Sequence, residues 1–494
     1  MKSLLFSGRG SVFFPCFLAA ILTLTGCAAV GPDYVRPGTE MPSTWHAAPD
    51  PAVVPDKAMI RRWWTVFEDS MLTQLIEEAA QSNLGLKAAV ARVDEARARL
   101  GVATGERVPR VDVQGSAIRR DSSENALSNF GTQTFYSPGI AASWEIDLFG
   151  RIRRSVEAAT ADFQATEEDR TDVLITLYAE VARTYMDIRA YQARLAAAEG
   201  NIKSQKQVLE LTRVRFKYGL TTDLDVAQAE RVLASSEAEV PPLRIELARA
   251  VNTMAVLLGR PPGNLYDELS VVGPIPLPPA KATVGVPVDM LRQRPDIRRA
   301  ERRLAAQTAR IGVATADLYP KLRLTGSIGL KSSESSGLFK SASRFWSIGP
   351  GISWNIFDAG SIRRNIEVQS AVQEQHLNAY EAAILKALEE VENALVAYAE
   401  EQNRRNSLNE AVQAAQRAVE LSQIKYQAGM IDFGNLLDAE RSLLSYQNRL
   451  LQSDGSVASN LVRLYKVLGG GWEVSATEKE NELRDRGNEY EEKT

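Results

Sequence analysis

Side chains that could perform covalent or metal chemistry are scarce in this sequence. The 494 residues include two histidines, His46 and His376, and two cysteines, Cys16 and Cys27. Neither histidine lies in a metal-ligand spacing, and the sequence holds no nucleophile elbow and no phosphate-binding glycine loop. A formal net charge of −4 gives no reason to expect a nucleic-acid partner. We therefore expect no enzymatic activity, no cofactor and no metal.

The residue best placed for covalent modification is Cys27. A basic start, an apolar stretch over 12–24 and small residues before Cys27 are typical of a bacterial lipoprotein signal. In that case the peptide 1–26 is removed and Cys27 becomes the lipidated first residue; an ordinary signal peptide is the alternative. Ala28 favours the outer membrane, because an aspartate there would resemble an inner-membrane retention signal. Cys16 leaves with the signal, so one chain cannot form a disulfide.

Acidic residues gather after two glycine turns. Asp223 and Asp225 follow Gly219, and Asp432 follows Gly429 in the same way. Glycine readily adopts the left-handed conformation that ends a helix, and aspartate is favoured at the first positions of the next one. These residues predict two helical hairpins, each with a tight, capped tip.

The elements that carry these turns are long helices. Apolar residues recur every seven positions from 174 to 216, a spacing that wraps a helix around its neighbours. A helix over about 155–217 would be roughly 95 Å long. The pattern returns 210 positions later, and Gly429 likewise lies 210 positions after Gly219, so we interpret the chain as a tandem duplication. The first set is Leu174, Val181, Ile188, Leu195, Ile202, Leu209 and Phe216; the second is Ile384, Val391, Tyr398, Val412, Val419 and Tyr426.

Shorter helices and connecting segments complete each repeat. We expect one helix over 72–107 and another over 224–258, the latter kinked at Pro241 and Pro242. The last segment is rich in charge and poor in apolar residues, which predicts disorder. The predicted order is a signal peptide (1–26), a lipidated arm (27–70), repeat one (71–263), a proline-rich linker (264–287), repeat two (288–472) and a charged tail (473–494).

Within each repeat the apolar period changes from helical to two. Alternation over 111–117 and 139–147, joined by a polar loop, predicts one β-hairpin, and 322–330 with 348–356 predicts a second. Four strands cannot close a barrel. They form either a small sheet packed on the helices or a share of a transmembrane barrel completed by other copies. The lipid anchor favours the barrel, with polar side chains facing inward: Asp112, Gln114, Glu145, Asp147 and Arg323.

Several motifs together resemble one family. The segment 31–37, Gly-Pro-Asp-Tyr-Val-Arg-Pro, is similar to the mature start of outer-membrane lipoproteins of tripartite multidrug efflux pumps, the TolC-like channels of the NodT and OprM type. The motifs at 294–298, 319–320, 353–360 and 426–429 resemble the same family. The resemblance extends over the mature chain to about Trp472.

The resemblance implies a mixed α/β membrane protein that works as a homotrimer. Three chains would form a twelve-stranded barrel in the outer membrane of a Gram-negative bacterium, continued by a long periplasmic helical barrel. It implies an exit duct that conducts small molecules passively, with a periplasmic adaptor protein at the tips around Gly219 and Gly429 and an inner-membrane RND transporter. A channel for type I protein secretion and a lipid-anchored coiled-coil scaffold are the alternatives; the scaffold leaves the strands unexplained.

The resemblance also implies a gate at the periplasmic tips. Asp225 and Tyr426 match positions that form an inter-repeat hydrogen bond in the family. Asp438 matches an acidic position facing the pore, whereas its usual partner position holds Asn435. We therefore expect a weaker ring of charge, or one moved to Asp432.

Overall fold

The computed structural model describes residues 29–38, 45–46, 61–121, 132–277 and 288–471. The predictions for the signal peptide, Cys27 and the tail 473–494 lie outside these residues. The chain forms two compact units, and each unit takes segments from both sequence repeats. The first unit draws on Met1–Thr39, Arg92–Glu167 and Arg299–Ala382, and the second on Glu40–Ala91, Glu168–Arg298 and Ala383–Thr494.

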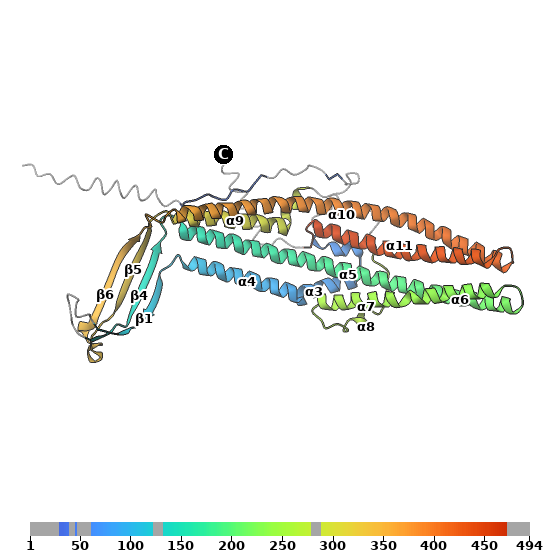
Figure 1. The fold of residues 1–494 in the computed structure, drawn as a ribbon, viewed down its shortest axis with the longest axis horizontal. Coiled ribbons are helices and arrows are strands. Elements are labelled where there is room, and N and C mark those ends of the chain that lie inside the picture. The colour runs from blue at the N-terminus through green and yellow to red at the C-terminus, as the bar shows by residue number, and fades with distance from the viewer. Residues whose placement is uncertain (1–28, 39–44, 47–60, 122–131, 278–287, 472–494) are drawn as a thin grey trace, which may run out of the picture. The chain divides into compact units, whose positions relative to one another are not determined.

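Two long helices, α5 and α10 in Figure 1, each contribute residues to both units. Helix α5 spans Arg151–Lys217 and α10 spans Ser361–Gln427, and each has 67 residues. A rise of 1.5 Å per residue makes each about 100 Å long. Their equal length and matching ends confirm the tandem duplication. The seven-residue pattern marks buried positions in the middle of each helix, such as Val181 and Val391, whereas Phe216 near the end of α5 is exposed.

Helix α5 begins four residues before the expected start because Asp147 caps it. The Asp147 carboxylate accepts hydrogen bonds from the backbone N–H groups of Ile152 (3.2 Å) and Arg153 (2.8 Å). Asp358 does the same for α10, accepting from the backbone of Ile362 at 2.6 Å. The prediction that Asp147 lines a barrel is therefore wrong, because the strand ends before it and its carboxylate binds a helix N-terminus.

The helix expected over 72–107 is two helices, α3 (Ser70–Ser82) and α4 (Leu84–Gly105). Asn83 separates them. Its side-chain oxygen accepts from the backbone N–H of Leu86 (2.9 Å), and its side-chain nitrogen donates to the carbonyl of Leu257 (2.8 Å). The break thus caps α4 and ties it to a segment 174 residues away.

The expected kinked helix over 224–258 is also two helices, α6 (Asp223–Ala238) and α7 (Val240–Leu257). Pro241 lies in the first turn of α7, where its missing N–H costs no helical hydrogen bond. The corresponding part of repeat two has no such break: α11 is one helix over Phe433–Val467. The other described helices are η1 (Trp63–Phe67), α8 (Tyr266–Leu269), η2 (Val288–Gln293) and α9 (Pro295–Ala316). Among the described helices, none is both long and apolar enough to cross a membrane.

The first unit contains a four-stranded antiparallel sheet in the order β1-β4-β5-β6 (Figure 1). Its strands are β1 (Arg110–Gln114), β4 (Gly139–Ile146), β5 (Lys321–Leu330) and β6 (Arg344–Ser353). Strand β6 ends before Trp354 and Ile356, which were expected to lie in it. The expected polar loop after β1 contains a second ribbon, β2 (Ala117–Arg120) paired with β3 (Gln133–Tyr136). Two single turns, η3 (Ser335–Gly337) and η4 (Ser341–Ser343), lie between β5 and β6.

The N-terminal motif at 31–37 is bound within the first unit. The Arg154 guanidinium, which is buried on α5, donates to the Val30 carbonyl (3.2 Å) and to the Asp33 carboxylate (2.7 Å). Gly31, at φ +90°, lies so close to Gly312 of α9 that a Cβ atom would overlap the Gly312 Cα. The motif therefore encodes a close backbone contact between the arm and the helices.

The motif at 294–298 has a structural role in the second unit. The Arg294 guanidinium donates to the Val467 carbonyl at the end of α11 (2.7 Å) and to the Glu390 carboxylate of α10 (2.8 Å). The same guanidinium also donates to the Asp296 carboxylate (2.7 Å). One buried arginine thus joins the start of α9 to both helices of the second hairpin.

Candidate functional site

The four-stranded sheet carries apolar side chains on one face. Its register places Ile140 opposite Ile328, Ile328 opposite Trp346, and Trp144 opposite Leu324. Many of these side chains are exposed, Ile328 by 62% and Trp346 by 75%. An exposed patch of large apolar side chains indicates a face that another phase or molecule covers. Its most exposed members are Val111, Val113, Ile140, Ile328, Trp346, Ile348 and Ile352.

The opposite face of the sheet is polar. Glu145 lies opposite Arg323, with 3.7 Å between their charged atoms, and the hydroxyls of Ser327 and Ser347 are 2.8 Å apart. The alternation expected from the sequence therefore places apolar side chains on one face of the sheet and polar side chains on the other. Asp112, Gln114, Glu145 and Arg323 share this polar face, as the pairing register shows.

The sheet has two open edges in the part of the chain that the structure describes. Strands β1 and β6 each pair on one side only. Backbone N–H and C=O groups at such an edge need partners wherever water is absent. A sheet with an apolar face and two open edges is built to continue into another sheet.

The helical hairpins of the second unit end in the tight tips that the glycines predict. Gly219 has φ +73° and Gly429 has φ +71°. At the end of α5 the backbone N–H of Leu220 donates to the Arg215 carbonyl (2.9 Å), and at the end of α10 that of Met430 donates to the Lys425 carbonyl (2.9 Å). These bonds satisfy carbonyls that a helix end leaves free. The tips expose the large side chains of Tyr218, Leu220, Leu224 and Met430.

Asp225 closes a capping box at the first tip. Its carboxylate accepts from the Thr222 backbone (3.1 Å), the Thr222 hydroxyl (2.9 Å) and the Thr221 hydroxyl (2.5 Å), while its own N–H donates back to the Thr222 hydroxyl (3.3 Å). Partial burial raises the pKa of Asp225, but the hydrogen bonds outweigh that effect and leave the pKa below its usual value. The expected capping role of Asp225 is confirmed, with Thr222 as the N-cap residue.

The second tip lacks this box. Asp432 occupies the N-cap position of α11 but makes no side-chain cap bond. Asn435 replaces the carboxylate that Asp225 supplies in repeat one, and only its backbone N–H bonds back, to the Asp432 carbonyl (3.2 Å). Asp438 is exposed and lies 3.9 Å from Arg441. Asp432 and Asp438 are thus both exposed, and Asp438 is paired with Arg441 of its own helix.

Tyr426 is buried at the second tip, but its hydroxyl has no hydrogen-bond partner among the described residues. Within one chain the Asp225 carboxylate bonds to threonines and not to Tyr426. The Tyr426 ring packs on Phe433 with centroids 5.3 Å apart, and the Arg215 guanidinium lies 4.7 Å from its centroid. Sequence reasoning missed Arg215; its only signal was a basic residue in the last turn of α5.

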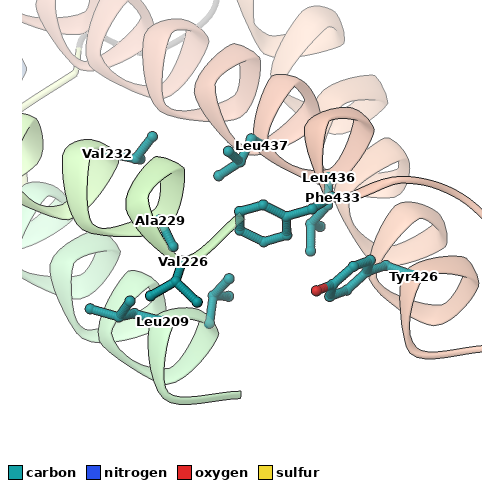
Figure 2. Close-up of a cluster of buried hydrophobic side chains, with 9 residues drawn as sticks. Leu209, Val226, Ala229, Val232, Tyr426, Phe433, Leu436 and Leu437 are labelled. Atoms are coloured by element: carbon teal, nitrogen blue, oxygen red, sulfur yellow. The ribbon is translucent and has the colours of Figure 1, made fainter. Parts of the chain in front are cut away.

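A hydrophobic cluster joins the two tips, as Figure 2 shows. It draws side chains from both hairpins, so the core of the tip forms between repeats rather than inside either one. Its members are Val208 and Leu209 of α5, Val226, Ala229 and Val232 of α6, Tyr426 of α10, and Phe433, Leu436 and Leu437 of α11.

One buried carboxyl oxygen near this cluster has no hydrogen-bond partner among the described residues. Glu440 follows Leu436 and Leu437 by about one helical turn, and its Oε2 atom is buried without a hydrogen bond among the described residues. Burial raises the pKa of Glu440 to about 7. Its counterpart in repeat one, Glu230, bonds to Arg213 at 2.7 Å, whereas the position matching Arg213 in repeat two is Gln423.

A sheet with one apolar and one polar face, carried in the same chain as two long helical hairpins with tight tips, is the architecture expected of a helical-barrel channel of the outer membrane. Residues 75–260 and 286–470 match the model of a family described as outer membrane efflux protein. The chain belongs to this family. The resemblance to TolC-like channels, the mixed fold and the outer-membrane location predicted from the sequence are thereby confirmed.

Relatives and solved structures agree over nearly the whole chain. The solvent efflux pump outer membrane protein SrpC of Pseudomonas putida is 34% identical, covering 92% of this chain and 98% of its own. Nodulation protein T of Rhizobium leguminosarum bv. trifolii is 32% identical, covering 91% and 96%. The outer-membrane channel OprN superposes with a TM-score of 0.84 at 37% identity, covering 90% and 100%. The open state of the Neisseria gonorrhoeae channel MtrE gives 0.79 at 30%, covering 90% and 98%.

Proposed function

We propose that this protein is the exit duct of a tripartite efflux pump, which conducts small molecules passively through the outer membrane. The observation that carries the proposal is the exposed apolar face of the four-stranded sheet. Transfer of this face from water into hydrocarbon is favourable, while the opposite polar face suits a water-filled lumen. Strands β5 and β6 have ten residues each, which is the length that a tilted membrane strand needs.

The duct is proposed to be a homotrimer. Pairing the β1 edge of one copy with the β6 edge of the next closes twelve strands into a barrel and leaves no edge in lipid. A lipid anchor on Cys27 would add a second attachment to the membrane. The mass of the solubilised assembly tests this part directly.

The helical tips are the proposed contact with a periplasmic adaptor protein, which in turn links the duct to an inner-membrane RND transporter. The turns at Gly219 and Gly429 present exposed apolar side chains, Leu220 and Met430 among them. Such side chains at a loop tip favour a protein partner.

The same tips are the proposed gate. Asp432 and Asp438, repeated three times around the axis of a trimer, would place carboxylates in a narrow tunnel and attract cations. Asp225, Tyr426 and Asn435 complete the proposed set. The Tyr426 hydroxyl is buried and has no hydrogen-bond partner among the described residues.

Planar-bilayer conductance of the purified protein, with its mass measured in parallel, tests the proposal. We expect a trimer whose conductance rises in discrete steps and is small at rest. A stable oligomer that never conducts, even after Asp225→Ala and Tyr426→Ala are combined, would exclude a channel.

A further inference from the structure

We infer that Arg215 is the latch that holds the two helical tips of one chain together, and is thus a positioning residue for the gate. The inference rests on the proposed function and concerns a residue outside the set expected from the sequence. Arg215 lies in the last turn of α5, in repeat one, yet its contacts are with the last turn of α10, in repeat two.

The Arg215 guanidinium makes two kinds of contact with α10. Its Nη1 atom donates to the carbonyl oxygens of Tyr426 (3.3 Å) and Gln427 (3.4 Å). These carbonyls lie at the end of the helix, where the helix dipole is negative and a cation is stabilised. The Tyr426 carbonyl also accepts from the backbone N–H of Gly429 (3.0 Å). The same guanidinium lies 4.7 Å from the centroid of the Tyr426 ring, within the range of a cation–π contact.

Burial strengthens the contacts that Arg215 makes with Tyr426. Tyr426 is only 3% exposed, and the Nε atom of Arg215 is buried. Water and salt therefore screen the interaction less than they would screen a surface pair. A planar guanidinium can face a ring and donate from its edge at once, whereas an ammonium group cannot reproduce this geometry.

The neighbouring cations do not share this role. Arg213, two residues earlier on α5, bonds to Glu230 of α6 at 2.7 Å and so joins the two helices of its own hairpin. The position that matches Arg215 in repeat two is Lys425, which is exposed. The latch therefore acts in one direction, from the first hairpin to the second.

The position of Tyr426 thus depends on Arg215. The ring forms part of the cluster between the two tips, where it packs on Phe433 (Figure 2). A movement that separates the hairpins has to break the Arg215 contacts and expose this ring to water. Arg215 consequently favours the state in which the two tips of a chain stay together.

Bilayer conductance of matched variants of the full-length trimer tests the latch. We expect Arg215→Ala to raise the resting conductance by roughly tenfold, since a desolvated cation–π contact with charged hydrogen bonds has about that effect on an equilibrium. Arg215→Lys keeps the charge but loses the fork and should rescue the closed state in part. Arg213→Ala removes the same charge nearby and should conduct like the wild type. Tyr426→Phe keeps every Arg215 contact, so its effect should be independent of Arg215→Ala, and the double variant should conduct no more than the sum of the two effects. Tyr426→Ala removes the ring that Arg215 contacts, so it should add little to the conductance of Arg215→Ala.

Three results would overturn the latch. Arg215→Ala could match Arg213→Ala, or Arg215→Lys could be as leaky as Arg215→Ala. Equal and independent effects of Arg215→Ala and Tyr426→Ala would also show that the two residues do not act together. A trimer that never conducts, in the wild type and in every variant, would remove the proposed channel and the latch with it.

Discussion

We expect Glu440 to make the stability of the helical tip depend on pH. Burial raises its pKa from the usual 4.5 to about 7. In the folded tip the neutral form is favoured, so the contribution of this group to stability is fully present below pH 4.5. It is lost as pH rises from about 4.5 to about 7, because the unfolded chain releases its proton first. A shift of this size corresponds to about 3 kcal/mol.

The substitution Glu440→Gln tests this reasoning. Glutamine resembles the protonated acid, so the variant should match the wild type near pH 4 and be more stable above pH 7, by up to about 3 kcal/mol. Hydrogen exchange of the α11 backbone amides between pH 4 and 8, corrected for intrinsic rates, measures local stability in the intact trimer. Resting conductance should rise with pH in the wild type more than in the variant.

Glu230→Gln is the matched control. Glu230 holds the same position in repeat one but has an exposed ion pair with Arg213, and loss of that pair should cost less than about 1 kcal/mol. If the wild type and Glu440→Gln show the same pH dependence of α11 exchange, the carboxyl is not held neutral by burial and the reasoning is refuted.

The other predictions concern the sheet and the tips. Ile352→Lys, on the apolar face of the sheet, should cost about 2–4 kcal/mol in the membrane and reduce the yield of membrane-inserted trimer, whereas Thr325→Lys on the polar face should be tolerated; equal yields would mean that lipid does not cover the apolar face. Phe433→Ala, which removes a ring only 2% exposed from the cluster between the tips, should cost about 3–5 kcal/mol by thermal unfolding, and Phe357→Ala, which is 85% exposed, should have little effect. Equal losses would show that the cluster does not stabilise the tip. Asp225→Ala removes the capping box and should cost about 1 kcal/mol and raise resting conductance; unchanged conductance in Asp225→Ala would exclude it from the gate.

The sequence by itself was enough to predict elements whose signals lie within a few residues. The seven-residue spacing predicted α5 and α10, the alternation predicted β4 and β5, and Gly219 and Gly429 predicted the tips. These patterns reflect backbone geometry, in which side-chain period and glycine conformation act locally. The family could be predicted as well, because its motifs at 31–37 and 294–298 are recognisable in the sequence, and the structure shows that both make close packing or charge contacts.

Only the tertiary structure shows the helix ends, contacts and burial that depend on residues far apart in the sequence. Asn83 ends a helix because it also bonds to Leu257, and Asp147 caps α5 rather than facing a lumen because β4 ends before it. Arg215 and Tyr426 are 211 residues apart, and nothing local to either predicts their contact. The pKa of Glu440 is raised by burial, and burial exists only once the helices have packed, so the sequence alone could not predict it. A helix period shows which face is apolar, but only packing determines which neighbour that face meets.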